Sequence, residues 1–332
     1  MQWADRIGHR IKLRDLHVLI AVAQTGSMTK AAEGLAISVP VVSKAISDLE
    51  HTLGVRLLDR SAHGVELTPY GRALLDSSVA AFDELRQGVK HIEFLADPRA
   101  GEVRVGCPVT MATGFVSGVI DRFSEKYPRT VVHLLAAESA ATCTALEERK
   151  VDLVIVGMYG PLDEAHLNAE ILFHEPFVVA AGCQSKWAKR RSVKLAELID
   201  ERWTLPPSDT PFGSVVVEAF RASGLEVPRA TVVTSSVPAR NRLVATGRFL
   251  TALPRSMLRF HPKNAEVKIL PIDLPTTRRP IGIITLKNRS LSPVAQLFIA
   301  CARELATRSA DRNQAMPTRA LAPRLGRRRE RP

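Results

Sequence analysis

The chain has 332 residues, 45% of them hydrophobic, and a formal net charge of +12 at pH 7. This length is too great for one small domain and leaves room for a sizeable second folded unit. No apolar run is long enough to cross a bilayer, and the first residues lack the apolar core of a secretion signal, so we expect a cytoplasmic protein with no membrane partner.

A helix is predicted over residues 13–25, followed by two short helices joined by a tight turn within residues 27–54. The hydroxyl of Ser27 can cap the first helix of this pair. The second helix opens at Ser38, also a good cap, with Pro40 in the first turn, where its missing N–H does little harm. Three short helices in this order can enclose a small apolar core.

The last of these helices has two different faces. Val42, Ile46, Leu49 and Leu53 recur at spacings of four, three and four, which predicts one buried stripe. Another face carries small, polar and basic side chains with few acids, which suits a recognition helix against base edges in the major groove of double-stranded DNA. The DNA contacts predicted for the helix pair are Ser27, Thr29, Lys30, Val39, Pro40, Ser43, Lys44 and Ser47. The alternative is a packed helical hairpin with no DNA target.

Two short strand-like segments flank residues 61–64 and can pair as the wing of a winged helix. Arg60 and His63 would then lie near backbone phosphates, and the alternative for Arg60 is a solvated surface charge. We therefore predict a winged helix-turn-helix DNA-binding domain over residues 10–69.

A long helix is predicted from Thr68 and Pro69, a cap followed by a first-turn proline, to about residue 97. Its apolar residues alternate spacings of three and four, as in a coiled coil, and only Ser78 weakens the pattern. We predict that residues 70–97 form a dimerisation helix, because paired heads match paired DNA half-sites. The predicted seam consists of Leu75, Phe82, Leu85, Val89 and Ile92. The alternative is that this face packs on the chain's own downstream domain.

The order of these segments resembles that of LysR-type transcriptional regulators. The similarity lies in GSMTKAAEGLA, SVPVVSKAISDLE, LGVRLLDR and GVELTPYG, within the N-terminal third of the chain. The resemblance implies a regulator that binds DNA as a dimer or a tetramer, with RNA polymerase as a candidate partner. Family members often carry glutamine before the recognition-helix proline, where this chain has Val39, so the family's operator sequence does not carry over.

The pattern changes to alternating strands and helices after a hinge at residues 97–101, which predicts a parallel sheet with helical crossovers. The strand-like segments of the first part are 102–107, 131–135 and 152–157. A second cluster of strand-like and helical segments within 176–253 predicts a second lobe, and residues 280–286 return the chain to the first lobe. The predicted fold class is therefore α+β multidomain, with a two-lobed α/β domain over residues 101–306 that follows the winged helix and the linker helix.

This second part resembles the family's effector-binding domain, which is shaped like a periplasmic solute-binding protein. The similarity rests on Val103–Gly106, Asp152-Leu153 and Leu243–Gly247, and the SDTPFG loop is similar to that of the galactose-binding-protein regulator branch. That branch implies a sugar-related or other small organic effector. Ligands of such domains bind between the lobes, where strand ends meet helix N-termini. The predicted effector contacts are Thr110, Met111, Ser208, Asp209, Ser235 and Ser236, each of which could instead be an ordinary cap or turn residue.

Other functions lack support in the sequence. No nucleophile elbow, phosphate-binding loop, dinucleotide fingerprint or metal-ligand cluster is present, so we expect no enzyme, cofactor or metal. A solute-binding protein would not need the N-terminal domain, and a DNA-packaging protein would not need the two lobes. The cysteines are Cys107, Cys143, Cys183 and Cys301. They are predicted to be reduced core residues, since redox sensing would require the fold to bring Cys143 and Cys183 together.

Residues 308–332 form a basic tail that contains eight arginines and two acidic residues. This excess of positive charge supplies half of the net charge of the chain. The prolines and arginines of this segment predict disorder. It either attracts DNA phosphates nonspecifically or only solubilises the chain.

Overall fold

The computed structural model describes residues 10–61, 64–159, 163, 165–259 and 266–314. The chain divides into two compact units, residues 1–92 and 93–332. The first is called the head below, and the second contains lobe 1 and lobe 2. The predicted contact His63 and the end of the predicted basic tail, residues 315–332, lie outside the described residues.

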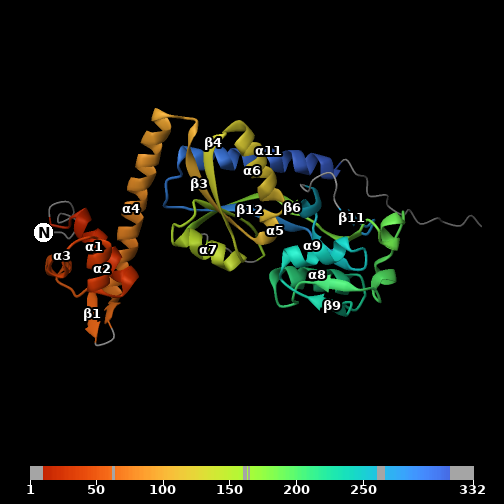
Figure 1. Cartoon of the computed structure of the whole chain (residues 1–332), viewed down its shortest axis with the longest axis horizontal. Helices are drawn as coiled ribbons and strands as arrows, with labels where there is room; N and C mark the ends of the chain where they lie inside the picture. The colour runs from red at the N-terminus through yellow and green to blue at the C-terminus, as the bar shows by residue number, and fades with distance from the viewer. Residues whose placement is uncertain (1–9, 62–63, 160–162, 164, 260–265, 315–332) are drawn as a thin grey trace, which may run out of the picture. The chain divides into compact units, whose positions relative to one another are not determined.

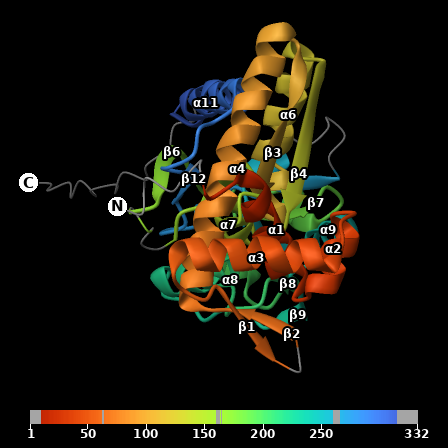
Figure 2. The same ribbon diagram turned by 90° about the vertical axis from the view of Figure 1, so that its left-hand side faces the viewer.

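The head is a three-helix core with a two-stranded wing. Its elements are α1 (Leu13–Thr25), α2 (Met28–Gly34), α3 (Val39–Leu53), β1 (Leu58–Ser61), β2 (Gly64–Leu67) and the long helix α4 (Pro69–Ala96). Figure 2 shows α3 across the head with the β1–β2 ribbon extending below it. The predicted stripe of α3 is in the core, where Val42, Ile46 and Leu49 are fully buried against α1 and α2. Ala31 and Ala32 are also buried, which allows the close helix crossing.

The helix ends of the head follow their sequence signals with one exception. The Ser27 hydroxyl accepts a hydrogen bond from the Lys30 N–H at 3.4 Å and caps α2. The Thr68 hydroxyl accepts from the Gly71 N–H at 3.0 Å and caps α4. Ser38 takes the N-cap position of α3, but its side chain makes no capping hydrogen bond.

Lobe 1 is a five-stranded sheet covered by helices on both faces. Its elements are β3 (Ala100–Cys107), α5 (Val109–Ala112), α6 (Phe115–Lys126), β4 (Arg129–Ala136), α7 (Ser139–Glu147), β5 (Leu153–Gly157), β6 (Leu167–Glu175), β12 (Arg279–Leu286) and α11 (Pro293–Gln314). The strand order is β4-β3-β5-β12-β6. Helices α6 and α11 lie along one face, where Phe123 and Phe298 meet in the core, and α7 covers the other (Figure 1). Helix α11 continues to Gln314, so the predicted tail is helical over its first residues, 308–314.

Lobe 2 repeats this three-layer arrangement. Its elements are β7 (Phe177–Gly182), the 3₁₀ turns η2 (Lys186–Lys189) and η3 (Leu195–Leu198), β8 (Trp203–Leu205), α8 (Pro211–Ala222), β9 (Ala230–Val233), α9 (Val237–Ala245), β10 (Leu250–Pro254), α10 (Ser256–Arg259) and β11 (Val267–Ile269). The strand order is β11-β7-β10-β8-β9. Helix α8 packs on one face of this sheet through Phe220, which meets Trp203, and Val237 of α9 packs on the other face.

Both sheets mix strand directions, which departs from the predicted parallel sheets. In lobe 1, β12 is antiparallel to β5 and β6, and in lobe 2, β7 is antiparallel to β10 and β11. The strands β7 and β12 are the first strands after each crossing between the lobes, at Pro176 and before Arg279. Each joins its sheet directly from the other lobe, without the helical crossover that makes neighbouring strands parallel. The two crossings are tied together, since the Phe177 N–H donates to the Thr277 hydroxyl at 3.3 Å.

Candidate functional site

The predicted DNA-reading face of α3 is exposed, while the opposite face of the helix is buried. Val39, Pro40, Lys44 and Ser47 are exposed, and Ser43 is half-buried. On α2, Thr29 and Lys30 are exposed as well, whereas Ser27 is half-buried and caps the helix. This face therefore offers small apolar, hydroxyl and ammonium groups beside one another, which is the chemistry that base edges and phosphates accept.

The wing is fastened to α3 by a carboxylate that the sequence reasoning assigned no role. The Glu50 Oε1 atom accepts hydrogen bonds from the N–H groups of Leu57 and Leu58, at 2.8 and 3.2 Å. The strand β2 is held from the other side, because the Val65 N–H donates to the Gly26 carbonyl at 3.1 Å. The sequence signals for Glu50 were its place next to the buried stripe of α3 and its position in the segment SVPVVSKAISDLE, which resembles the family.

The start of α4 completes this attachment. The Thr68 hydroxyl donates to the Arg56 carbonyl at 2.7 Å, and the Thr68 N–H donates to the Leu57 carbonyl at 3.0 Å. A Cβ added at Gly71 would lie 2.0 Å from the Leu57 carbonyl oxygen, so no side chain fits there. The hairpin and the recognition helix thus have a fixed relation within the head.

The predicted seam of α4 is partly packed in the head and partly exposed. Phe82 is half-buried, and its ring lies 5.6 Å from that of His17 on α1. Leu75 is also half-buried. Leu85, Val89 and Ile92 are 51, 54 and 67% exposed. An apolar row of this kind is costly in water and calls for a partner surface.

The predicted effector contacts lie at the carboxyl ends of strands, but they differ in burial. Thr110 is buried in α5, and its hydroxyl has no partner among the described residues. Met111 packs in the core of lobe 1, so its side chain is a core residue and not a surface contact. Ser208 and Asp209 are exposed in the turn before α8. The cap of that helix is Thr210, whose hydroxyl accepts from the Gly213 N–H at 3.1 Å.

Ser235 and Ser236 are exposed at the start of α9. The Ser236 hydroxyl accepts from the Ala239 N–H at 3.4 Å, so Ser236 caps α9. This is the alternative role that the sequence left open for it. A capping hydroxyl keeps a further lone pair and its own hydrogen, so the same residue can still contact a ligand.

The two lobes meet at a polar junction that the sequence reasoning did not find. The Glu175 Oε1 atom, at the end of β6, accepts from the Ser256 N–H of lobe 2 at 3.0 Å. The other oxygen of Glu175 and the hydroxyl of Ser256 are buried without a partner among the described residues. Burial raises the pKa of Glu175, although its hydrogen bond to Ser256 opposes this shift. Gly114 lies against the same segment, since a Cβ there would be 3.1 Å from the Ser256 hydroxyl.

Aromatic and charged side chains surround this junction. Tyr159 follows β5, and its ring lies 6.3 Å from that of Phe212 in α8 of lobe 2. Burial, reinforced by the charge of Glu175, raises the pKa of Tyr159 to about 12. Arg279 forms an ion pair with Glu218 of α8, so the return crossing is also tied to lobe 2. The position of Tyr159 beyond a buried strand was a signal in the sequence, because ligands gather at such strand ends.

The remaining sequence predictions concern the cysteines, possible metal ligands and possible membrane spans. Cys107 and Cys301 are buried as predicted, and burial raises the pKa of Cys107 to about 12. Cys183 is exposed, which contradicts its assignment to the core, and it follows β7 of lobe 2, whereas Cys143 lies in α7 of lobe 1. Within the described residues, no group of histidine, cysteine and acidic side chains is arranged to hold a metal ion, and no helix is long and apolar enough to span a membrane.

Comparison with known proteins gives matches along most of the chain. Residues 13–72 match the family model for the bacterial regulatory helix-turn-helix protein, lysR family, and residues 96–307 match that for the LysR substrate binding domain. The transcriptional dual regulator GltC of Bacillus subtilis (strain 168) is 28% identical over 87% of this chain and 95% of its own. The HTH-type transcriptional regulator GbpR of Azospirillum brasilense is 26% identical over 93% of this chain and 90% of its own. GbpR is thus one of several distant relatives, and no branch within the family is singled out.

The fold has solved counterparts as well. A full-length OxyR variant from Pseudomonas aeruginosa matches 90% of this chain and 95% of its own, with a TM-score of 0.62 at 23% identity. That likeness concerns the fold and not the ligand.

Proposed function

We propose, from the premise that this chain belongs to the LysR family of bacterial transcriptional regulators, that the exposed face of α3 binds base edges in the major groove. Family membership makes the protein a DNA-binding regulator with an effector-binding domain and not an enzyme. The observation that carries the proposal is the division of α3 into a buried apolar stripe and an exposed face with Lys44 and Ser47. Because its DNA target is chromosomal, we place the protein in the cytoplasm.

The reading face is tested with Lys44→Ala in a binding assay at fixed salt, on genomic fragments first located by footprinting. Loss of an ammonium group that contacts a base or a phosphate should weaken specific binding by about tenfold and reduce its salt dependence. Lys12→Ala is the matched control, since Lys12 is an exposed lysine of the same head outside this face. Equal affinities of the two variants would show that the face is wrongly assigned.

We further propose that α4 pairs two copies of the chain, so that two heads reach two half-sites of an inverted repeat. The exposed row Leu85, Val89 and Ile92 supports this pairing, because burial against a second copy removes it from water. Two such dimers would join through their effector domains into a tetramer. RNA polymerase is the partner through which a bound regulator would act on transcription.

The effector is proposed to bind at the junction of lobe 1 and lobe 2. Thr110, Glu175 and Ser256 support this, since each has a buried polar atom that has no partner among the described residues and that a ligand could satisfy. Ser208 and Asp209 contribute from the turn before α8, and Ser235 and Ser236 from the start of α9. The ligand class is a small organic molecule, and the resemblance of the SDTPFG loop to that of the galactose-binding-protein regulator branch favours a sugar-related one.

The effector site is tested by a thermal-shift screen of sugars and other small organic compounds with the full-length protein. Thr110→Val keeps the side-chain shape and removes the hydroxyl, so it should reduce the ligand-induced shift with little change in the ligand-free melting temperature. Thr113→Val is the matched control, because the Thr113 hydroxyl already donates to the Val109 carbonyl at 3.0 Å. A full ligand-induced shift in Thr110→Val would reject this position for the ligand.

A further inference from the structure

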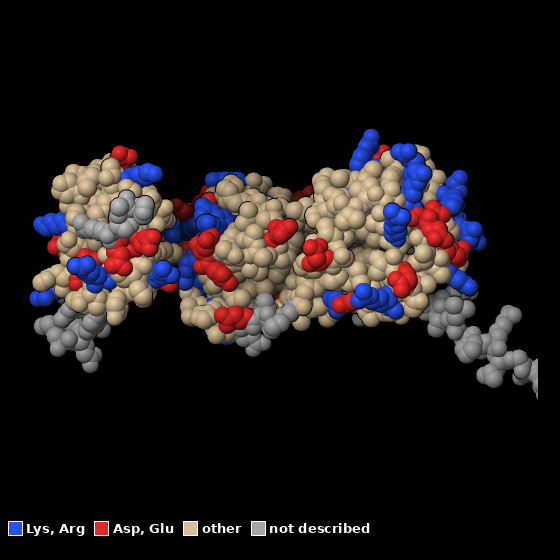
Figure 3. Space-filling model, turned by 90° about the horizontal axis from the view of Figure 1, so that it is seen from below, with Lys and Arg blue, Asp and Glu red and all other residues tan. Residues whose placement is uncertain are grey.

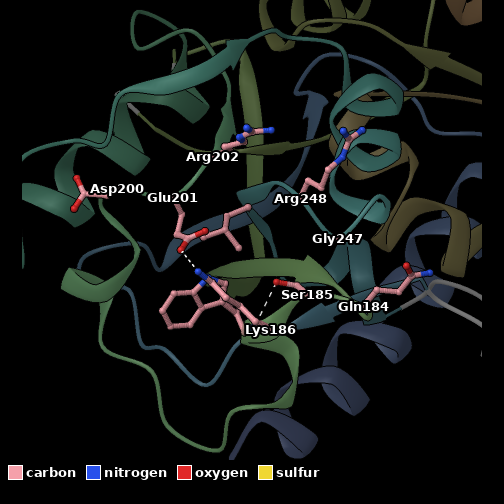
Figure 4. Close-up of a pocket in the computed structure, with 10 residues that line it drawn as sticks. Gln184, Ser185, Lys186, Asp200, Glu201, Arg202, Gly247 and Arg248 are labelled. Atoms are coloured by element: carbon pink, nitrogen blue, oxygen red, sulfur yellow. Dashed lines mark hydrogen bonds and ion pairs between the residues drawn. The ribbon is translucent and has the colours of Figure 1, made fainter.

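A pocket lies in lobe 2, away from the proposed effector junction. It has a volume of about 450 Å³ and is formed where β7 ends and where β8 and β10 begin (Figure 4). The proposed effector contacts Ser208 and Ser235 follow β8 and β9, so they lie at the opposite end of the same sheet. A pocket of this size falls within the range of roughly 300–1,000 Å³ that small-molecule sites occupy.

Two arginines line this pocket without a partner of their own. Arg202 precedes β8 and Arg248 precedes β10, and these segments are neighbours because the Leu250 N–H donates to the Arg202 carbonyl at 2.8 Å. Neither guanidinium makes a hydrogen bond or an ion pair with any residue that the structure describes. Figure 4 shows both side chains on the upper side of the pocket. Two unpaired cations over one hollow form a receptor for an oxyanion.

The other charges of the pocket do not neutralise these arginines. The Lys186 ammonium lies 2.7 Å from the Glu201 carboxylate, so these two charges compensate each other. Asp200 also lines the pocket, and in Figure 4 it lies on the far side from Arg248.

Trp187 gives the pocket an aromatic wall. Two cations lie close to its indole ring, with the Lys186 Nζ atom 5.1 Å and the Arg190 guanidinium carbon 5.2 Å from the ring centroid. Its backbone N–H donates to the Ser185 hydroxyl at 3.3 Å, which fixes the turn. The indole N–H is buried and has no acceptor among the described residues. A buried donor of this kind is normally satisfied, and an oxygen of a bound ligand could accept from it.

Lobe 2 is also basic around this pocket. Figure 3 shows Lys and Arg side chains gathered at the end of lobe 2 that carries η2, with a few acidic side chains among them. Lys189 and Arg191 are exposed in this segment, and Arg190 is paired with Glu197 at 3.1 Å. Such a local excess of positive charge raises the concentration of small anions near the pocket.

We propose that this pocket binds a small molecule through a phosphate or carboxylate group held between Arg202 and Arg248, with Trp187 as the wall beside it. The site is separate from the junction of the lobes and goes beyond the effector binding proposed above. The pocket is a half-open hollow that can receive the head group of a small molecule.

The test is a titration of the full-length protein with inorganic phosphate and, separately, with succinate, at constant ionic strength maintained with chloride. Calorimetry measures binding. Tryptophan fluorescence is compared with that of Trp187→Phe, because Trp3 and Trp203 also contribute to the signal of the full-length protein. The variant is Arg202→Gln with Arg248→Gln, which removes both charges from exposed positions. The matched control is Arg242→Gln, because Arg242 is an exposed arginine of the same lobe that does not line the pocket.

We expect saturable binding of at least one of the two anions by the wild type and by Arg242→Gln, and at least tenfold weaker binding by the double variant. The anion that binds with the higher affinity shows whether the head group of the ligand is a phosphate or a carboxylate. The proposal is overturned if neither anion binds saturably below about 10 mM, or if the double variant binds as tightly as the control. Effector binding at the junction would survive either negative result, because Arg202 and Arg248 take no part in it.

Discussion

The attachment of the wing to the recognition helix can be tested through Glu50. Its Oε1 atom is the acceptor for two backbone N–H groups of the segment that leads into β1, at 2.8 and 3.2 Å. Glu50→Ala removes both bonds and leaves two donors at a half-buried place in the head. Glu50→Gln keeps one oxygen acceptor and removes only the charge, so the pair of variants separates the hydrogen bonds from the charge.

The size of the effect follows from these two bonds. A hydrogen bond to a charged acceptor contributes about 1.5–3 kcal/mol when it is buried. Because water can reach part of this site, we take about 1 kcal/mol for each bond and predict that Glu50→Ala lowers the free energy of unfolding of the head by about 2 kcal/mol. Glu50→Gln should cost about half of that. Release of the wing should also weaken operator binding by several-fold, since β1 then no longer keeps a fixed place beside α3.

The assay is urea unfolding of the full-length protein followed by far-UV circular dichroism, with operator binding measured on the same samples. Glu33→Ala is the matched control, because Glu33 is an exposed glutamate on α2 and its side chain has no bond to a described residue. The reasoning is refuted if Glu50→Ala behaves like Glu33→Ala in both measurements. Loss of operator binding without loss of stability would instead place Glu50 against DNA.

Two further predictions concern α4 and the lobe junction. Val89→Asp puts a charge on the exposed apolar row of α4, so sedimentation should show dissociation of dimers into monomers, and an unchanged assembly would reject the row as the interface. At the junction, burial raises the pKa of Glu175. Between the ordinary glutamate pKa and the raised one, the folded protein therefore holds a proton that the unfolded chain has released. The free energy of unfolding should fall as the pH rises through this range. Glu175→Gln should therefore raise the melting temperature near pH 8 more than near pH 5, and an equal change at both pH values would mean that Glu175 is ionised in the folded state.

Much of the head could be read from the sequence because its signals are local. The spacing of Val42, Ile46 and Leu49 specified the buried side of α3 within one helix, and Ser27 and Thr68 marked helix starts by their own hydrogen bonds. The role of Glu50 could not be read in the same way. Its partners are seven and eight residues away, beyond the reach of helical periodicity.

The lobes were less accessible to this reasoning. The sequence predicted alternating strands and helices, but it missed β6, β8 and β11. The strand β6 alternates exposed and half-buried residues without a clear apolar pattern, and β8 and β11 have only three residues each. Strand direction was also missed, because apolar runs such as Phe177–Gly182 look the same in parallel and antiparallel sheets. The junction of Glu175 with Ser256 joins residues 81 positions apart, and no local pattern reports such a pairing.

The position of Glu175 explains how a ligand at the junction could act on the domain as a whole. Glu175 is the last residue of β6, and the next residue begins the crossing into lobe 2, so its carboxylate lies at the point where the lobes are connected. Ser256 binds it from lobe 2, and Phe177 and Thr277 tie the two crossings to each other. A ligand can form a hydrogen bond with the second carboxyl oxygen of Glu175, which has no partner among the described residues. At this site it gains that bond only in lobe arrangements that keep Ser256 and Glu175 together. Such a ligand therefore shifts the population of lobe arrangements by its difference in affinity between them, and needs no contact with the head to do so.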